Sequence, residues 1–201
     1  MKVIAHLLLV IVVFLLSACA STITKTDIAK IKVVGVVNNF PDSPKYTLVG
    51  TTVFNNDYDT INDTTFKSLV TNEVTTLLQN KGYQTIILSK GDAGNRIDMM
   101  IEILPRDLYN MPYTMGYGFY QRSMFGITAN KISYTALNLI PVIQGSKRCS
   151  ACYGESITNL PMDVMPSKWS EIGQEKQVEL KNLLKADIQK AVNKAFSGIG
   201  L

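Results

Sequence analysis

The sequence predicts an α/β (α+β) domain, built as a single mixed sheet of about five to six strands with two amphipathic helices packed on it, plus a long hairpin. Three observations lead to this prediction. The segment Ile31 to Val37 is β-branched and nearly continuously apolar, which is typical of a central strand. Two later segments repeat apolar residues at helical spacing. Between them, Lys81-Gly82-Tyr83 joins a helical pattern to a strand pattern, which lays an amphipathic helix across the sheet.

The first half of the body alternates strand and helix patterns. Turn residues follow the first strand, and residues 46–54 are expected to form the second, with a turn at 55–57. Asp63 or Thr64 can cap the first helix, and Gly82 is well placed to end it. Residues 83–88 and 96–104 are predicted strands on either side of an exposed turn at 90–95. The apolar face of the helix consists of Phe66, Leu69, Val70, Val74, Leu77 and Leu78.

The second half ends in a hairpin and a helix. Residues 107–125 show neither helical nor strand periodicity, whereas residues 132–144 and 153–159 flank a long hairpin tip. In the last helix, the same periodicity places Lys181 and Lys185 on the solvent side. Its apolar side consists of Leu180, Leu183, Leu184, Ile188, Ala191, Val192, Ala195 and Phe196.

The N-terminus has the pattern of an export signal. Lys2 precedes an apolar run of about ten residues, and small residues follow it. This run is too short to span a bilayer stably. We therefore expect residues 1–18 to be a signal peptide, residues 19–29 to be a tether, and residues 30–201 to form one domain.

Leu16-Ser17-Ala18-Cys19 resembles the lipobox of bacterial lipoproteins. The resemblance implies that Cys19 becomes the mature N-terminus and carries a diacylglycerol and, in many bacteria, an amide-linked third acyl chain such as palmitate. Two or three chains make membrane anchoring nearly permanent. Ala20 stands where lipoproteins retained in an inner membrane carry Asp, so the resemblance favours an outer membrane, facing the periplasm. An ordinary secreted protein or an uncleaved anchor remains the alternative.

The order of predicted elements in the body also resembles small α/β envelope lipoproteins. The phrases that carry this similarity are Val33-Val34-Gly35-Val36-Val37 and Leu77-Leu78-Gln79-Asn80-Lys81-Gly82-Tyr83. Such lipoproteins include uncharacterised families and the auxiliary lipoproteins of secretion and outer-membrane assembly machines. They generally act by binding partners, and the resemblance implies the same here.

Composition limits the classes of partner. The whole chain carries a formal charge of +4, and removal of the signal, whose one charged residue is Lys2, leaves +3 on the remaining 183 residues. So small a balance does not indicate nucleic-acid binding. A charged fraction of 18% and an apolar fraction of 46% suit a globular domain.

Residues suited to catalysis are sparse. The only histidine, His6, belongs to the signal, so the body lacks histidine triads and histidine-ligated metal sites. None of the sixteen acidic residues stand in a recognisable motif, although two carboxylates from distant positions could still converge. We expect a non-enzyme that needs no cofactor, with a periplasmic enzyme as the alternative.

Cys149-Ser150-Ala151-Cys152 is the sharpest local motif of the body. In an oxidising compartment, Cys149 and Cys152 are expected to form a structural disulfide. A redox pair would place the motif at the start of a helix after a strand, but Tyr153-Gly154-Glu155-Ser156 indicates a turn into a strand. Redox chemistry and metal binding remain alternatives, although no second cysteine pair supports zinc.

The aperiodic stretch is rich in aromatic and methionine side chains interrupted by glycine. One interpretation is a loop folded over the sheet edge, with its side chains filling the core. The other is an exposed patch for a partner or a bilayer. Copper binding by Met111, Met115 and Met124 is a further alternative, and so is an apolar ligand pocket lined by Tyr113, Met115 and Tyr117. The expected patch consists of Tyr109, Met111, Tyr113, Met115, Tyr117, Phe119 and Tyr120.

Taken together, these features predict a non-catalytic, membrane-anchored envelope lipoprotein that binds or assists another envelope protein. The acyl anchor, the missing histidine and the aromatic patch support this interpretation. A periplasmic enzyme using carboxylates or the Cys149/Cys152 pair is the second hypothesis. A ligand or metal carrier is the third.

Overall fold

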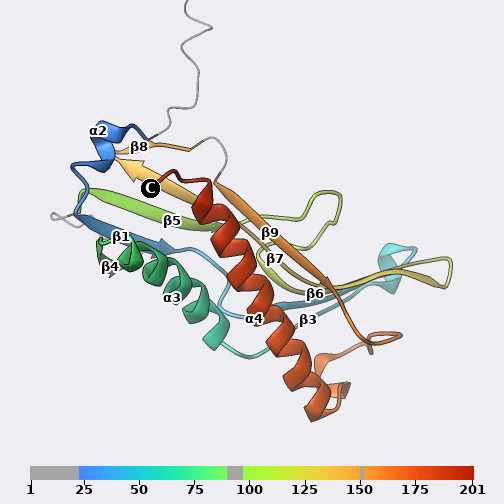
Figure 1. Cartoon of the computed structure of the whole chain (residues 1–201). Helices are drawn as coiled ribbons and strands as arrows, with labels where there is room; N and C mark the ends of the chain where they lie inside the picture. Colours follow the sequence, from blue (N-terminus) through green and yellow to red (C-terminus); the bar gives the residue numbers. More distant parts are fainter. Residues whose placement is uncertain (1–22, 90–96, 150–151) are drawn as a thin grey trace, which may run out of the picture.

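The computed structural model describes residues 23–89, 97–149 and 152–201 (Figure 1). The predicted signal peptide, Cys19 and the predicted turn at 90–95 lie outside these residues. The described chain forms one mixed sheet with helices α3 (Thr65–Asn80) and α4 (Gln174–Ser197) on one face, which confirms the predicted α+β class. A one-turn helix, α2 (Lys25–Ile28), lies at one end of the sheet (Figure 1).

The sheet has nine strands, arranged in the order β3-β2-β6-β7-β5-β1-β4 with β8 and β9 also paired to β7. Strand β1 runs parallel to β4 and β5, and β2 runs parallel to β6, while the other pairs are antiparallel. The strands are β1 (Val33–Asn38), β2 (Lys45–Val49), β3 (Asp57–Thr60), β4 (Gln84–Leu88), β5 (Met99–Pro105), β6 (Tyr117–Met124), β7 (Ile127–Ile143), β8 (Ser146–Lys147) and β9 (Tyr153–Asn159).

The expected number of five to six strands was too low, because three strands have no clear sequence signal. β3 replaces part of the expected turn after residue 54, and it is a short, polar edge strand. β8 has only two residues. β6 lies inside the aperiodic stretch, where its first five residues are all buried, so no alternation marks them. The second strand is also shorter than predicted, because β2 ends at Val49 and a 3-10 turn, η1 (Val53–Asn55), follows it.

Strand β7 is the long central strand of the sheet, and two strands pair in succession with one of its edges, so that the sheet forks there. The first part of β7 pairs with β6, up to Thr135, and the second part pairs with β5, from Leu137 onward. Strand β9 pairs with the opposite edge and forms the predicted long hairpin with β7. The chain therefore leaves β5 and re-enters at β6 on the same edge, and the residues between them project from the fork.

Helix α3 forms where the sequence predicts it. Phe66, Val70, Val74 and Leu78 make its buried face. Asp63 Oδ1 accepts hydrogen bonds from the backbone N–H and the hydroxyl of Thr65, which helps to satisfy the free donors of the first turn. At the other end, Gly82 has a φ of +90°, its N–H donates to Gln79, and the N–H of Tyr83 donates to Leu78. This is the Schellman arrangement that a glycine permits.

Helix α4 covers β7 and β9. Its buried stripe contains Leu184 and Ile188, as predicted, and also Asp187, which is fully buried. Close packing depends on Gly154 in β9, because a Cβ atom there would collide with the backbone oxygen of Ala191. The expected solvent position is correct for Lys185, which is exposed, but wrong for Lys181. The Nζ of Lys181 lies 2.8 Å from Asp63 Oδ2, because the start of α3 packs beside α4.

Segment 160–173 closes the core between β9 and α4. Its tryptophan, Trp169 in the turn η2 (Trp169–Glu171), stacks on Phe119 at a centroid distance of 5.3 Å. The same ring contacts Tyr46 edge-on at 5.8 Å, and its backbone N–H donates to Asp59 Oδ2. Strands β2, β3 and β6 are thereby joined to the start of α4.

Part of the predicted tether is folded. Thr24 and Asp27 form a reciprocal capping box that starts α2, and Ile23 packs against the main core. Within residues 23–89, 97–149 and 152–201, no helix is long and apolar enough to cross a membrane.

Candidate functional site

The aromatic stretch is divided by the fork in the sheet. Tyr117, Phe119 and Tyr120 belong to β6 and are completely buried, so the expectation that they form part of an exposed patch was wrong. Tyr117 and Phe119 point into the core under the helices, where Tyr117 contacts Phe40 and Phe66. Tyr120 faces the opposite side of the sheet, in a second apolar cluster.

Residues 106–116 form a loop with a closed base. The N–H of Gly116 donates to the carbonyl of Arg106, and Ala136 in β7 accepts from Arg106 and donates to Gly116. Both ends of the loop are thus fixed to the same residue of the central strand. Compact loops whose ends meet in this way are frequently functional.

The loop is held by buried contacts. Thr114 is fully buried, and its Oγ1 accepts from the N–H of Leu108 and donates to the carbonyl of Met111. Leu108 is 3% exposed and joins Tyr120 and Tyr134 in the second cluster, against which Met111 also packs. The inner side of the loop is therefore fixed to the sheet, and its backbone is ordered before any partner binds.

The outer side of the loop is aromatic. Tyr109 is 82% exposed, Tyr113 50% and Met115 44%. Tyr58 of β3, which the sequence interpretation missed, is 56% exposed and meets Tyr113 edge-on at 5.2 Å. Desolvation, followed by the hydrogen bond with Tyr113, raises the pKa of Tyr58. We call Tyr58, Tyr109, Tyr113 and Met115 the aromatic loop patch.

Backbone geometry at the patch is unusual. Asn110 and Tyr113 have φ values of +56° and +67°, in the left-handed region that side chains other than Gly, Asn and Asp rarely adopt. Asn110 tolerates this conformation, but Tyr113 does so at a cost. Strain of this kind persists only where the surrounding structure imposes it, and it is concentrated at functional sites.

The copper and ligand-pocket alternatives do not fit this geometry. Met115 precedes β6 and Met124 ends it, so the rise of the strand separates them by about 20 Å. They cannot share a metal ion with Met111. Tyr117 is enclosed by the core, so it cannot line an open pocket with Tyr113. Among the described residues, no three His, Cys, Asp or Glu side chains gather as a metal site.

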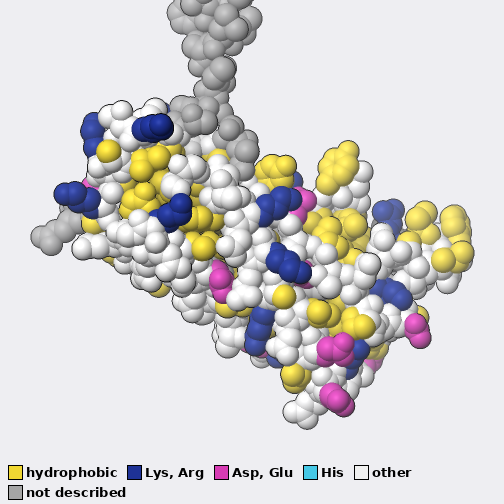
Figure 2. Space-filling view, viewed as in Figure 1, with side chains coloured by type: hydrophobic (Ala, Val, Ile, Leu, Met, Phe, Trp, Pro, Cys, Tyr) yellow, Lys and Arg dark blue, Asp and Glu magenta, His cyan; other side chains and the backbone are white. Residues whose placement is uncertain are grey.

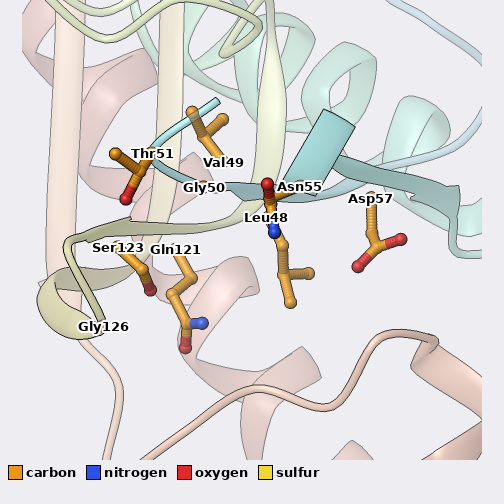
Figure 3. A pocket seen from close by; sticks show the side chains of 9 residues that line it. All are labelled: Leu48, Val49, Gly50, Thr51, Asn55, Asp57, Gln121, Ser123 and Gly126. Carbon is orange, nitrogen blue, oxygen red and sulfur yellow. The ribbon is translucent and has the colours of Figure 1, made fainter. Parts of the chain in front are cut away.

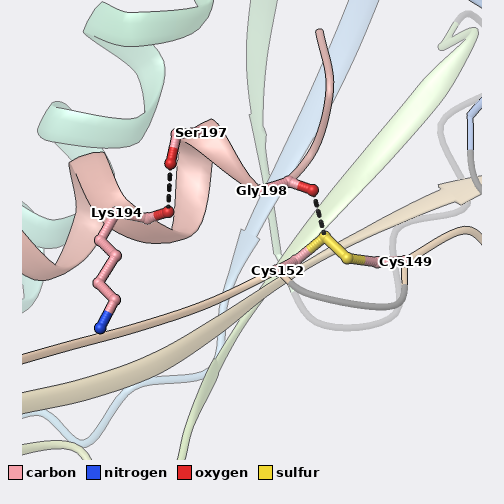
Figure 4. The surroundings of a disulfide bond; sticks show 5 residues. All are labelled: Cys149, Cys152, Lys194, Ser197 and Gly198. Carbon is pink, nitrogen blue, oxygen red and sulfur yellow. Dashed lines mark hydrogen bonds between the residues drawn. A yellow bond between two sulfur atoms is a disulfide. The ribbon is translucent and has the colours of Figure 1, made fainter.

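Cys149 and Cys152 are joined by a disulfide, as predicted (Figure 4). Cys152 is 4% exposed and belongs to the main core, where its Sγ lies 3.6 Å from the carbonyl oxygen of Gly198. Strand β9 begins directly after it, at Tyr153. The bridge therefore sits between the hairpin tip and the end of α4, which is a structural position.

A pocket of about 260 Å³ lies beside the outer part of the β6–β7 hairpin, with Gly126 of its turn in the lining (Figure 3). The lining also includes Thr51 and Asn55 from the segment after β2, Asp57 from the start of β3, and Gln121 and Ser123 from β6. Gln121 is engaged, because its Oε1 accepts from the N–H of Met165. With one carboxylate and no histidine or cysteine, this lining offers no nucleophile paired with a base.

Comparisons with known proteins add little. No family model and no curated protein matches the sequence. A crystal structure of a Xanthomonas campestris protein, described by the family model DUF330, has 10% identity and a TM-score of 0.42, covering 84% of this chain and 82% of that one. A second crystal structure, of an uncharacterized protein, has 13% identity and a TM-score of 0.38, covering 83% and 91%. Such low similarity supports no functional argument, so the site rests on its own geometry.

Proposed function

We propose that this protein is a non-catalytic lipoprotein of the cell envelope that binds another envelope protein through the aromatic loop patch. The observation that carries the proposal is the fixed loop, which exposes Tyr109, Tyr113 and Met115 and places Tyr113 against exposed Tyr58. Tyrosine and methionine are enriched in protein interfaces, and tyrosine supplies a large contact area at low entropic cost. A loop that is already ordered keeps the entropic cost of binding small.

The anchoring part of the proposal rests on the sequence alone. The lipobox-like segment Leu16 to Cys19 supports acylation of Cys19, and Ala20 supports sorting to an outer membrane that faces the periplasm. Cys19→Ser removes the thiol that acylation needs, so the precursor should remain unprocessed. Mass spectrometry of the mature N-terminus tests this step, and an unmodified terminus at another residue would contradict it.

Photocrosslinking in the producing cells tests the partner site. A photoreactive phenylalanine analogue placed at Tyr109 or Tyr113 should give a discrete crosslinked species. The same analogue at Tyr153 is the control matched to Tyr113, because Tyr153 is 46% exposed and its ring already packs against Arg106. Adding Tyr58→Ser should weaken the adduct at Tyr113. Equal crosslinking at Tyr153, or none from the loop, would reject the patch as the binding site.

A further inference from the structure

The turn between β6 and β7 carries an apolar tip that lies apart from the aromatic loop patch. Phe125 is 83% exposed, Ile127 72% and Met124 44%. Phe54 in the neighbouring turn η1 is 94% exposed, and Thr51 Oγ1 accepts a hydrogen bond from the N–H of Phe125. Figure 1 shows the hairpin and η1 projecting together from one end of the sheet, and Figure 2 shows hydrophobic side chains at that end. We call Phe54, Met124, Phe125 and Ile127 the apolar tip.

The conformation of the tip is costly. Phe125 and Gly126 connect paired Met124 and Ile127, with φ values of +49° and +78°. A two-residue turn with both φ values positive normally takes Asn-Gly or Asp-Gly. Phenylalanine at the first position is strained by its Cβ atom, and it exposes nearly its whole ring to water. A phenylalanine at position 125 improves neither the stability nor the solubility of the protein. This indicates that its ring contacts something other than this chain.

The charges around the tip favour an anionic surface. Arg122 and Lys131 lie on the two strands of the hairpin, opposite Asn130 and Gln121 respectively, and the Nζ of Lys131 also donates to the carbonyl oxygen of Asp163 at 2.8 Å. The sequence contains no Asp or Glu between Asp107 and Glu155. It contains none between residues 42 and 57 either, so the two segments of the tip carry no carboxylate themselves, although Asp57 lines the pocket beside Gly126. Basic side chains beside a few apolar ones match a bilayer interface, where the former meet anionic headgroups and the latter enter the acyl region.

The shape of the tip also favours a bilayer over a folded protein. Its side chains project from two narrow turns, and Gly126 has nothing within 4 Å of where a Cβ atom would lie. A protein interface needs a complementary surface on the partner, whereas insertion of projecting apolar side chains into a bilayer needs none. We propose that the apolar tip is a membrane-insertion point for bilayers with anionic headgroups, independent of any acyl chain at Cys19.

In this proposal, β7 links the apolar tip to the opposite end of the sheet. This strand has seventeen residues, so at about 3.3 Å per residue it runs for roughly 55 Å from the tip toward the end of the sheet where α2 lies (Figure 1). An acyl anchor at Cys19 would hold that end, and the tip would hold the other. Two such contacts with one bilayer lay the sheet lengthwise along the surface.

Sedimentation with vesicles tests the tip without the acyl chains. All described helices and strands lie between residues 25 and 201. The protein is therefore produced without residues 1–20, and circular dichroism checks that it is folded. We expect it to sediment with vesicles of 70% phosphatidylcholine and 30% phosphatidylglycerol (about these proportions, to give an anionic surface) and less with pure phosphatidylcholine. Absence of binding to both overturns the proposal and leaves a protein partner as the occupant of the tip.

Phe125→Asn separates binding from folding. Asparagine suits the left-handed position, so this variant should melt at the same temperature as the unaltered protein or higher. Losing the exposed ring should still weaken vesicle binding by about tenfold or more. Ile127→Thr, which keeps a β-branched residue in β7, should also weaken binding. Val178→Ser is the control, because Val178 is 55% exposed on α4 and should not affect binding. Unchanged binding in Phe125→Asn, or an equal loss in Val178→Ser, overturns the proposal.

Discussion

Among single residues, Asp187 is the most unexpected, because it is an acidic side chain in the apolar stripe of a helix. It is completely buried in the apolar stripe of α4, and its Oδ1 accepts hydrogen bonds from Ser156 at 2.6 Å and Thr158 at 2.8 Å. Both hydroxyls belong to β9, so the carboxyl group fixes the position of the helix along the strand. The spacing of Leu184, Asp187 and Ile188 already places Asp187 on the buried face, a signal that the sequence interpretation passed over.

Replacing Asp187 should separate hydrogen bonding from packing. Asp187→Ala leaves two buried hydroxyls without an acceptor, so we expect the free energy of unfolding to fall by about 1.5 to 3 kcal/mol. Asp187→Asn keeps an oxygen acceptor and should cost clearly less. Urea denaturation followed by circular dichroism compares them, with exposed Lys190→Ala as the control on the same helix. An Asn variant as unstable as the Ala variant would contradict this account.

Asp63 has a second role besides capping α3, the ion pair with Lys181, which the sequence did not show. Although burial alone raises its pKa, the hydrogen bonds from Lys181 and Thr65 outweigh burial and hold the pKa below its usual value. A carboxyl group with a lowered pKa stabilises the folded state at pH values above its unfolded pKa of about 3.9. That stability is lost as the pH falls through the folded pKa.

Lys181→Met should therefore destabilise the protein in a pH-dependent way. Because the side chains of Lys181 and Asp63 are 29% and 18% exposed, we expect the loss near neutral pH to be at most about 1 kcal/mol. The difference from the unaltered protein should shrink as the pH falls below about 4, where Asp63 of the unfolded chain becomes protonated, and should vanish below the lower pKa of folded Asp63. Urea denaturation at several pH values measures it. Lys185→Met is the control, because Lys185 lies on the exposed face of the same helix. A loss of unfolding free energy that stays constant down to about pH 2 would rule out the ion pair.

At the scale of elements, α4 depends on its buried stripe. Leu184 is fully buried in the main core, so Leu184→Ala should lower the free energy of unfolding by about 2 to 5 kcal/mol. The adjacent Lys185 is exposed, and Lys185→Ala should change it by less than about 0.5 kcal/mol. Chemical denaturation compares the two variants. Equal effects would mean that α4 is not packed on the sheet.

The hairpin tip beyond β7 depends less on its bridge. The ring closed by Cys149 and Cys152 is so small that it removes little entropy from the unfolded chain. The double variant Cys149→Ala/Cys152→Ala should therefore fold, with a free energy of unfolding lower by about 2 kcal/mol. Denaturation measures this loss, and thiol labelling of the non-reduced protein checks the bond. Complete unfolding of the variant, or quantitative labelling of both cysteines, would refute the structural role.

For the whole molecule, the sequence predicted the elements whose patterns are local. Helices α3 and α4 each bury one face, which their periodicity identifies, and β1 is identified by its short, β-branched and nearly continuous apolar run. The end of α3 at Gly82 was also predictable locally, because glycine favours the left-handed conformation that follows a helix. The disulfide was predictable because its two cysteines are three residues apart.

The parts that were missed depend on distant contacts. The division of the aromatic stretch into a loop and β6 follows from the fork along β7, and no local pattern shows that the chain returns to that strand at Tyr117. Tyr58 reaches the aromatic loop patch only because β3 pairs with β2 beside β6. Burial of Tyr120 and exposure of Tyr109 are therefore properties of the folded sheet.

Trp169 is the single tryptophan of the sequence, so the tryptophan fluorescence of the protein comes from one known position in the fold. Its indole stacks on Phe119 and contacts Tyr46, so its emission senses the half of the sheet that contains β2 and β6. Loosening of β4 at the far edge leaves that environment intact, although it reduces the far-ultraviolet dichroism of the whole chain. Coincident curves from the two signals indicate one cooperative unit. If the curves separate, the distance between their midpoints measures how independently the two arms of the fork unfold.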